Sequence, residues 1–239
     1  MNGRQVNEMN NADSRGGRLY FAVSMLLMLL INRIIFPLGH LLSWGAPHRD
    51  LSLPIDAKIP FLPWMIAVYI GVFAWWVYVS WLIADHDRQK ADRFFLAQLL
   101  IDFICLLFFV FFPTSIVRPE LNGQSIWVVF LKLLYEFDTP DNLFPSIHCA
   151  LGWLCWIGIR GNKEYSSAIR SVSFVMAVAV CFATIAIRQH VLADVFAGIL
   201  LSEICWLLAD IPALRGLYSG FIDHLMQRIN KTSERNGAI

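Results

Sequence analysis

Apolar residues in this chain occur in long runs that short polar clusters separate. The run at residues 61–84 holds no charged residue over 24 positions, which corresponds to roughly 36 Å of helix at about 1.5 Å per residue. Because the hydrocarbon core of a bilayer is roughly 30 Å thick, this run is long enough to cross it. The whole pattern predicts an all-α bundle of six transmembrane helices, over residues 19–44, 61–84, 94–112, 145–159, 172–187 and 191–209.

The polar residues between the runs predict how the bundle lies in the membrane. The N-terminal tail, the loops 85–93 and 160–170, and the C-terminal tail hold 13 of the 19 Lys and Arg residues. Since cytoplasmic segments are enriched in Lys and Arg, we expect these four segments in the cytoplasm. The predicted domains are a cytoplasmic tail at 1–18, a six-helix domain at 19–209 and a cytoplasmic tail at 210–239, in a multi-pass protein of the cell membrane.

Composition favours a membrane protein over a soluble one. Hydrophobic residues make up 57% of the chain and charged residues 15%, whereas soluble domains have about 45–50% and about 25%. The five cysteines all lie inside apolar runs, and their odd number argues against a disulfide framework. The partners that we expect are the bilayer and a lipid substrate, with no nucleic acid.

Polar residues inside or beside the runs each have a structural interpretation. Asp102 lies within the third run, where an ionisable group is a functional candidate, although hydrogen bonding between helices would also explain it. The aromatic segment 127–135 is expected at the outer membrane interface. Asp138, Asp141 and Asn142 precede the fourth run and are expected to cap its helix, with contact to a lipid headgroup as the alternative.

The fourth run is informative because it is short. Its 15 residues rise only about 22 Å as a helix, less than the hydrocarbon core. Its beginning, with Ser146 and His148, is therefore expected slightly below the membrane surface. Polar groups at that depth must face protein or water, which predicts a pocket there.

Six polar residues from distant parts of the chain are predicted at the same, non-cytoplasmic face. One follows the third helix, two begin the fourth, and three begin the sixth. They supply two histidines for nucleophilic and acid–base work, a carboxylate, a hydroxyl, and two guanidinium groups that suit a phosphate. This set can carry out phosphoryl transfer without a metal or other cofactor. The residues are Arg118, Ser146, His148, Arg188, His190 and Asp194.

Spacing suggests how these groups cooperate. If the sixth helix starts near Arg188, His190 and Asp194, four positions apart, share one helix face, and the carboxylate can accept a hydrogen bond from one ring nitrogen. The other nitrogen is then free to attack, as in catalytic triads. Pro145 suits the first position of the fourth helix, and the backbone amides of residues 146–148 would form an anion site at its N-terminus.

These residues resemble the motifs of a known enzyme family. P-S-I-H at 145–148, H-V-L-A-D at 190–194 and R-P at 118–119 are similar to motifs of the type 2 phosphatidic acid phosphatase superfamily of membrane lipid phosphatases. The resemblance covers residues 50–209 and includes the six-helix layout.

The resemblance implies a role for each matching residue. His190 would form a phosphohistidine intermediate, with Asp194 as its paired aspartate. His148 would donate the proton to the leaving group. Arg118 and Ser146 would contact the phosphate.

The chain also departs from the family pattern. The family's first motif begins with a lysine, but that place holds Phe111 here. Its third motif begins with Ser-Arg, and those places hold Ala183 and Thr184. Arg188, two positions before His190, is a candidate replacement for one of the missing cations.

The altered pattern leaves more than one function open. It is more similar to the branch that includes inositol phosphorylceramide synthases and bacterial relatives, in which a lipid alcohol rather than water receives the phosphoryl-linked group. We expect an enzyme that hydrolyses a lipid phosphomonoester or pyrophosphate, with headgroup transfer at the same site as the alternative. Outside this class, His148 and His190 could bind a haem, or a metal together with Asp194.

Overall fold

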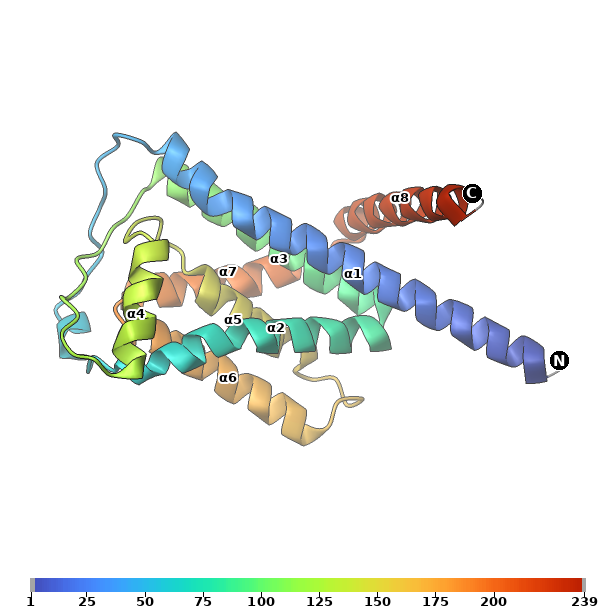
Figure 1. The fold of residues 1–239 in the computed structure, drawn as a ribbon, viewed down its shortest axis with the longest axis horizontal. Helices are drawn as coiled ribbons and strands as arrows, with labels where there is room; N and C mark the ends of the chain where they lie inside the picture. The colour runs from blue at the N-terminus through green and yellow to red at the C-terminus, as the bar shows by residue number, and fades with distance from the viewer. Residues whose placement is uncertain (1–2, 238–239) are drawn as a thin grey trace.

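The computed structural model describes residues 3–237, and the side chains of residues 16–232. This part of the chain is helical throughout, with two isolated β-bridges and no strand. Most helices run along the long axis of the molecule, and α4 lies across one end (Figure 1). The helices are α1 (Gly3–Leu42), α2 (Ile66–His86), α3 (Arg88–Phe111), α4 (Ile126–Phe137), α5 (Ile147–Ile159), α6 (Ser167–Ala186), α7 (Leu192–Leu208) and α8 (Pro212–Gly237), with short 3-10 helices η1 (Asp56–Lys58) and η2 (Pro63–Met65).

Four helices are long and apolar enough to cross a membrane. They comprise Gly16–Leu42, Pro63–His86, Arg88–Phe111 and Ser167–Ala186. A fifth span results if α7 and α8 are taken together, although the two bend by 87° at the break between them. The 13-residue α5 and the 17-residue α7 are shorter than the roughly 20 residues that span a bilayer. These lengths support a multi-pass membrane protein, and the number of six spans stays a prediction.

Both ends of the chain are more helical than the sequence suggested. α1 begins at Gly3 rather than near residue 19, because a helix already nucleated by an apolar segment extends at little cost. Most of the expected tail at 210–239 forms α8, which starts at Pro212, a residue suited to the first helical position. The two termini lie at the same end of the bundle, opposite α4 (Figure 1).

The short helix α5 forms the centre of the bundle. Ten of its 13 residues are buried, and it packs against α2, α3, α6 and α7. At Gly198 in α7, a Cβ atom would lie 2.6 Å from the carbonyl oxygen of Ser146. The absence of a side chain there lets the beginning of α7 approach the beginning of α5 at backbone distance, which positions the candidate site.

α4 is an amphipathic helix across the end of the bundle (Figure 1). The hydroxyl of Ser125 accepts a hydrogen bond from the amide of Val128 and caps its N-terminus. Val128 and Leu131 face the protein, whereas Phe130 and Phe137 are exposed. This arrangement suits a helix that lies at the interface between the bilayer and water, as expected for the aromatic segment 127–135.

Candidate active site

The core of the candidate site is a buried pair of His190 and Asp194. Nδ1 of His190 lies 3.2 Å from Oδ2 of Asp194, and the two residues are 7% and 1% exposed. Burial lowers the pKa of His190, but the hydrogen bond to Asp194 and its charge raise it further, so that this pKa lies above its ordinary value. The predicted contact is present, although His190 lies before the first residue of α7 rather than on the helix face that the four-residue spacing suggested. The contact leaves Nε2 of His190 without a hydrogen-bond partner among the described residues.

A tight turn at the end of α6 holds His190 in place. The amides of Gln189 and His190 both donate to the carbonyl oxygen of Thr184, at 2.9 Å and 3.2 Å. Arg188 has a φ of 56°, the left-handed conformation that commonly ends a helix and that glycine usually provides. The turn therefore closes α6 and directs the next residue towards the start of α7.

The side chain of Arg188 fastens this turn to η1. Its Nη1 and Nη2 groups donate to the carbonyl oxygens of Asp56 and Ile59, each at 2.7 Å. The carboxylate of Asp56 in turn accepts from the amide of Leu192, at 2.9 Å. Arg188 thus has a structural role in addition to the phosphate contact predicted for it, and its two backbone bonds use two of its five N–H donors.

Arg118 is held rigidly from several directions. Its guanidinium group donates to the carbonyl oxygen of Asp138 and to Oε1 of Gln189, and it lies 4.4 Å from the ring centre of Tyr135. The side chain is only 7% exposed, and its Nε has no hydrogen-bond partner among the described residues. Burial lowers the pKa of Arg118, although nearby Asp138 opposes this effect.

Tyr135, in the last turn of α4, and Asp138, which follows that helix, also surround Arg118. Burial raises the pKa of Asp138, although the charge of Arg118 opposes this effect. Burial also raises the pKa of Tyr135 to about 12, and its hydroxyl donates to the carbonyl oxygen of Ile187 at 2.6 Å. α4 is thereby connected both to the arginine and to the turn that carries His190.

An open cavity of about 400 Å³ joins these groups. Arg118, Arg188 and His190 all line it, together with Asp50 and Ser52 on the loop that follows α1. Two guanidinium groups and a histidine with a raised pKa make this part of the wall suitable for an anion. The structure therefore brings these three predicted residues to one cavity.

The start of α5 differs from the expectation for an anion site. Ser146, not Pro145, begins the helix as its N-cap, and its hydroxyl accepts from the amide of Cys149 at 3.3 Å. The amide of Ser146 donates to the carbonyl oxygen of Asp194 at 3.1 Å. Because both polar groups of Ser146 are engaged and the residue is fully buried, it joins α5 to α7, and its contact with a phosphate stays a prediction.

The acidic residues before α5 do not cap this helix, so that prediction is wrong. Asp138 follows the last residue of α4, and the carboxylate of Asp141 is hydrogen-bonded to Nδ1 of His40 at 2.8 Å. Asn142 is buried with a φ of 55°. The hydroxyl of Ser146 takes the cap position instead, because it lies directly before the first helical residue.

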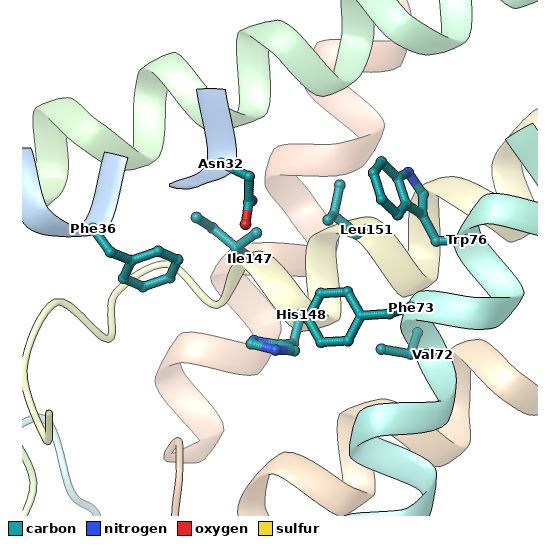
Figure 2. Close-up of a pocket in the computed structure, with 8 residues that line it drawn as sticks. All are labelled: Asn32, Phe36, Val72, Phe73, Trp76, Ile147, His148 and Leu151. Carbon is teal, nitrogen blue, oxygen red and sulfur yellow. The ribbon is translucent and has the colours of Figure 1, made fainter. Parts of the chain in front are cut away.

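His148 lies beside His190 but faces different surroundings. The centres of the two rings are 6.3 Å apart. The ring of His148 stacks on Tyr69 at 4.2 Å, and its Nδ1 lies 3.3 Å from the hydroxyl of Tyr69. It lines a small pocket between α1, α2 and α5 (Figure 2). His148 thus lines the apolar pocket, whereas its neighbour His190 lines the polar cavity.

Three supporting residues were not found from the sequence. Tyr69 and Tyr135 lie in segments read only as apolar or interfacial, and their contacts with the site are long-range. Gln189 directly precedes His190, and this adjacency was the one feature of the sequence that pointed to a role for Gln189 at the site. Within the part of the chain that the structure describes, no group of three or more His, Cys, Asp or Glu residues is arranged to hold a metal ion.

Comparisons with known proteins do not place the chain in a family. Neither a protein-family model, nor a curated protein, nor a solved structure matches it. The functional argument therefore depends on the site's own geometry and on the motif resemblance.

Proposed function

We propose that the protein is an integral membrane phosphatase that hydrolyses a lipid phosphomonoester or pyrophosphate through a phosphohistidine on His190, without a metal. The observation that carries this proposal is the buried pair of His190 and Asp194 beside a cavity lined by Arg118 and Arg188. His148 lies close enough to act on the same phosphoryl group. The resemblance to type 2 phosphatidic acid phosphatases adds support.

In the first step, Nε2 of His190 attacks phosphorus while Asp194 keeps the proton on Nδ1. The centres of the two histidine rings are 6.3 Å apart, and in this mechanism His190 contacts phosphorus while His148 contacts the leaving oxygen. The bond between phosphorus and the lipid oxygen breaks, and protonated His148 gives its proton to the leaving alkoxide. Arg118 and Arg188 stabilise the charge on the phosphoryl oxygens.

In the second step, His148 acts as the base. It takes a proton from a water molecule, whose oxygen attacks phosphorus as the bond to Nε2 breaks. Phosphate leaves, His190 is restored and His148 is protonated again. For a phosphomonoester, the balance is one lipid phosphate and one water consumed for one lipid alcohol and one phosphate released. A lipid pyrophosphate releases its lipid monophosphate in place of the alcohol.

The test is a phosphate-release assay on purified protein in detergent with a chelator present. The substrates are phosphatidate, a lysophosphatidate and farnesyl pyrophosphate, and released phosphate is measured. His190→Ala should abolish release, whereas His48→Ala, which changes an exposed histidine, should retain it. A phosphoryl label that is bound to the enzyme and lost in acid, and that forms on wild type but not on His190→Ala, would identify the phosphohistidine. Equal rates in wild type and His190→Ala would refute the proposal.

Headgroup transfer is the second candidate, and the pocket beside His148 favours it. This pocket lies on the apolar side of His148 (Figure 2), from which the hydroxyl of a lipid alcohol could reach the phosphohistidine in place of water. Repeating the assay with a phosphodiester lipid and a lipid alcohol, followed by mass spectrometry, distinguishes the two. A product that requires the alcohol and His190 indicates transfer, whereas phosphate release without it indicates hydrolysis.

A further inference from the structure

The pocket beside His148 combines apolar walls with one amide. Phe36 from α1 and Phe73 and Trp76 from α2 contribute aromatic side chains. Apart from His148 and the indole nitrogen of Trp76, its polar side chain is that of Asn32, whose amide oxygen turns towards the pocket (Figure 2). The space holds about 20 Å³, which is enough for one water-sized or hydroxyl-sized group.

Asn32 adjoins a buried polar cluster in α3, in which several polar atoms lack a hydrogen-bond partner among the described residues. Asp102 and Gln98 of α3 are both fully buried, and Asn32 and Gln98 are the polar neighbours of Asp102. Gln98 accepts a hydrogen bond from the indole of Trp76 at 3.0 Å. Both carboxylate oxygens of Asp102 and Nε2 of Gln98 have no hydrogen-bond partner among the described residues.

These polar groups are costly at membrane depth unless neighbouring side chains pair with them. An unpaired buried polar group costs roughly 1–3 kcal/mol, and ionisable residues inside membrane helices face functional cavities by default. The carboxylate of Asp102 can only accept hydrogen bonds when ionised, so it attracts the NH2 group of Asn32. The carbonyl oxygen of Asn32 then remains for the pocket, where it can accept a hydrogen bond.

We infer that Asn32 is a specificity-determining residue that accepts a hydrogen bond from a hydroxyl or amide N–H group of the substrate's lipid part. This inference rests on the proposed function and names the substrate class of the same site. The preferred substrates are lipid phosphates that carry such a donor close to the phosphoester oxygen. The hydrocarbon chain extends from the pocket between α1 and α2 into the bilayer. Phosphates of plain hydrocarbon alcohols lack the donor and are poorer substrates.

The experiment compares three single-chain phosphomonoesters in mixed micelles. Hexadecyl phosphate has no donor in its lipid part, palmitoyl lysophosphatidate has a hydroxyl, and N-palmitoylethanolamine phosphate has an amide N–H. For each, kcat/KM is measured with wild type, Asn32→Leu and the matched control Phe36→Leu, which changes an apolar residue one helical turn away in the same pocket.

We expect wild type to prefer at least one of the two donor-bearing substrates over hexadecyl phosphate. Asn32→Leu should reduce that preference about fivefold to tenfold, as expected for the loss of one hydrogen bond. Phe36→Leu should alter all three rates similarly and preserve the preference. If Asn32→Leu affects lysophosphatidate, Asn32 binds the hydroxyl; if it affects N-palmitoylethanolamine phosphate, Asn32 binds the amide N–H.

The inference is overturned if wild type shows no preference, if Asn32→Leu preserves it, or if Phe36→Leu reduces it equally. Because the readout is a ratio of rates, it does not depend on the amount of folded enzyme, and the smaller change Asn32→Ala is read in the same way. If His190→Ala matches wild type on all three substrates, the proposed function fails instead. The two failures are therefore distinguishable.

Discussion

Replacing Asp194 with asparagine should cost less here than in a serine-protease-type triad, and the structure gives the reason. Oδ2 of Asp194 accepts from the amide of Val191 at 3.0 Å as well as pairing with Nδ1 of His190. The backbone amide is always a donor, so the oxygen of the asparagine side chain must stay at this position. The same oxygen continues to accept the Nδ1 proton, which preserves the reactive tautomer of His190.

The loss is therefore mainly that of a negative charge. A hydrogen bond to a charged group contributes about 1.5–3 kcal/mol and a neutral one about 0.5–1.5 kcal/mol. The difference of about 1–1.5 kcal/mol corresponds to about a tenfold fall in kcat/KM. Asp194→Ala should lose considerably more, because it also leaves the buried amide of Val191 without its acceptor.

The pH profile provides an independent measure of the same effect. The attacking histidine must be neutral, so kcat/KM falls as pH drops through the pKa of His190. Because the bond and charge of Asp194 hold that pKa above its ordinary value against the effect of burial, the acid limb of wild type should lie above about pH 6.5. In Asp194→Asn the limb should shift to lower pH, since the charge that raises the pKa of His190 is removed.

The assay is phosphate release from the preferred lipid phosphate between pH 4.5 and 9 for wild type and both variants. A loss above about 10³-fold for Asp194→Asn, with an unshifted acid limb, would show that the tautomer is not preserved or that Asp194 reacts directly. No loss and no shift would show that its charge does not act on His190. Either result refutes the reasoning.

Three further predictions concern the surroundings of this pair. Gly198→Ala places a Cβ atom 2.6 Å from the carbonyl oxygen of Ser146; overpacking should lower the free energy of unfolding by about 1–3 kcal/mol, seen in a thermal melt, and a wild-type melt would contradict it. Arg118→Lys loses the planar fork and should reduce kcat/KM about 10²–10³-fold; an unchanged rate would place the phosphate elsewhere. Tyr69→Phe keeps the ring stacked on His148 but removes its hydroxyl, so kcat should fall several-fold with little change in KM, whereas equal kcat would exclude a positioning role.

Local sequence pattern was sufficient for the features that short-range forces determine. Long apolar runs predicted most of α2 and α3, because burying apolar surface in a bilayer requires only length and hydrophobicity. The four-residue spacing also predicted that His190 and Asp194 meet, but they meet for a different reason: His190 lies before α7 begins, and Asp194 reaches back from the first turn of that helix. The pattern did not predict that α1 begins at Gly3, since polar residues continue a helix without any apolar signal.

Tertiary packing decided the rest of the site. Arg118 contacts Gln189, 71 positions away, and His148 stacks on Tyr69, 79 positions away; neither contact has a local signal. The bond from the amide of Ser146 to the carbonyl oxygen of Asp194 follows from the close approach of α5 and α7 at Gly198. Sequence by itself determined which segments become helices and which chemical groups are available. Helix crossing alone determined which of those groups share the polar cavity and which face the apolar pocket, because crossing depends on side-chain shapes summed over the whole bundle.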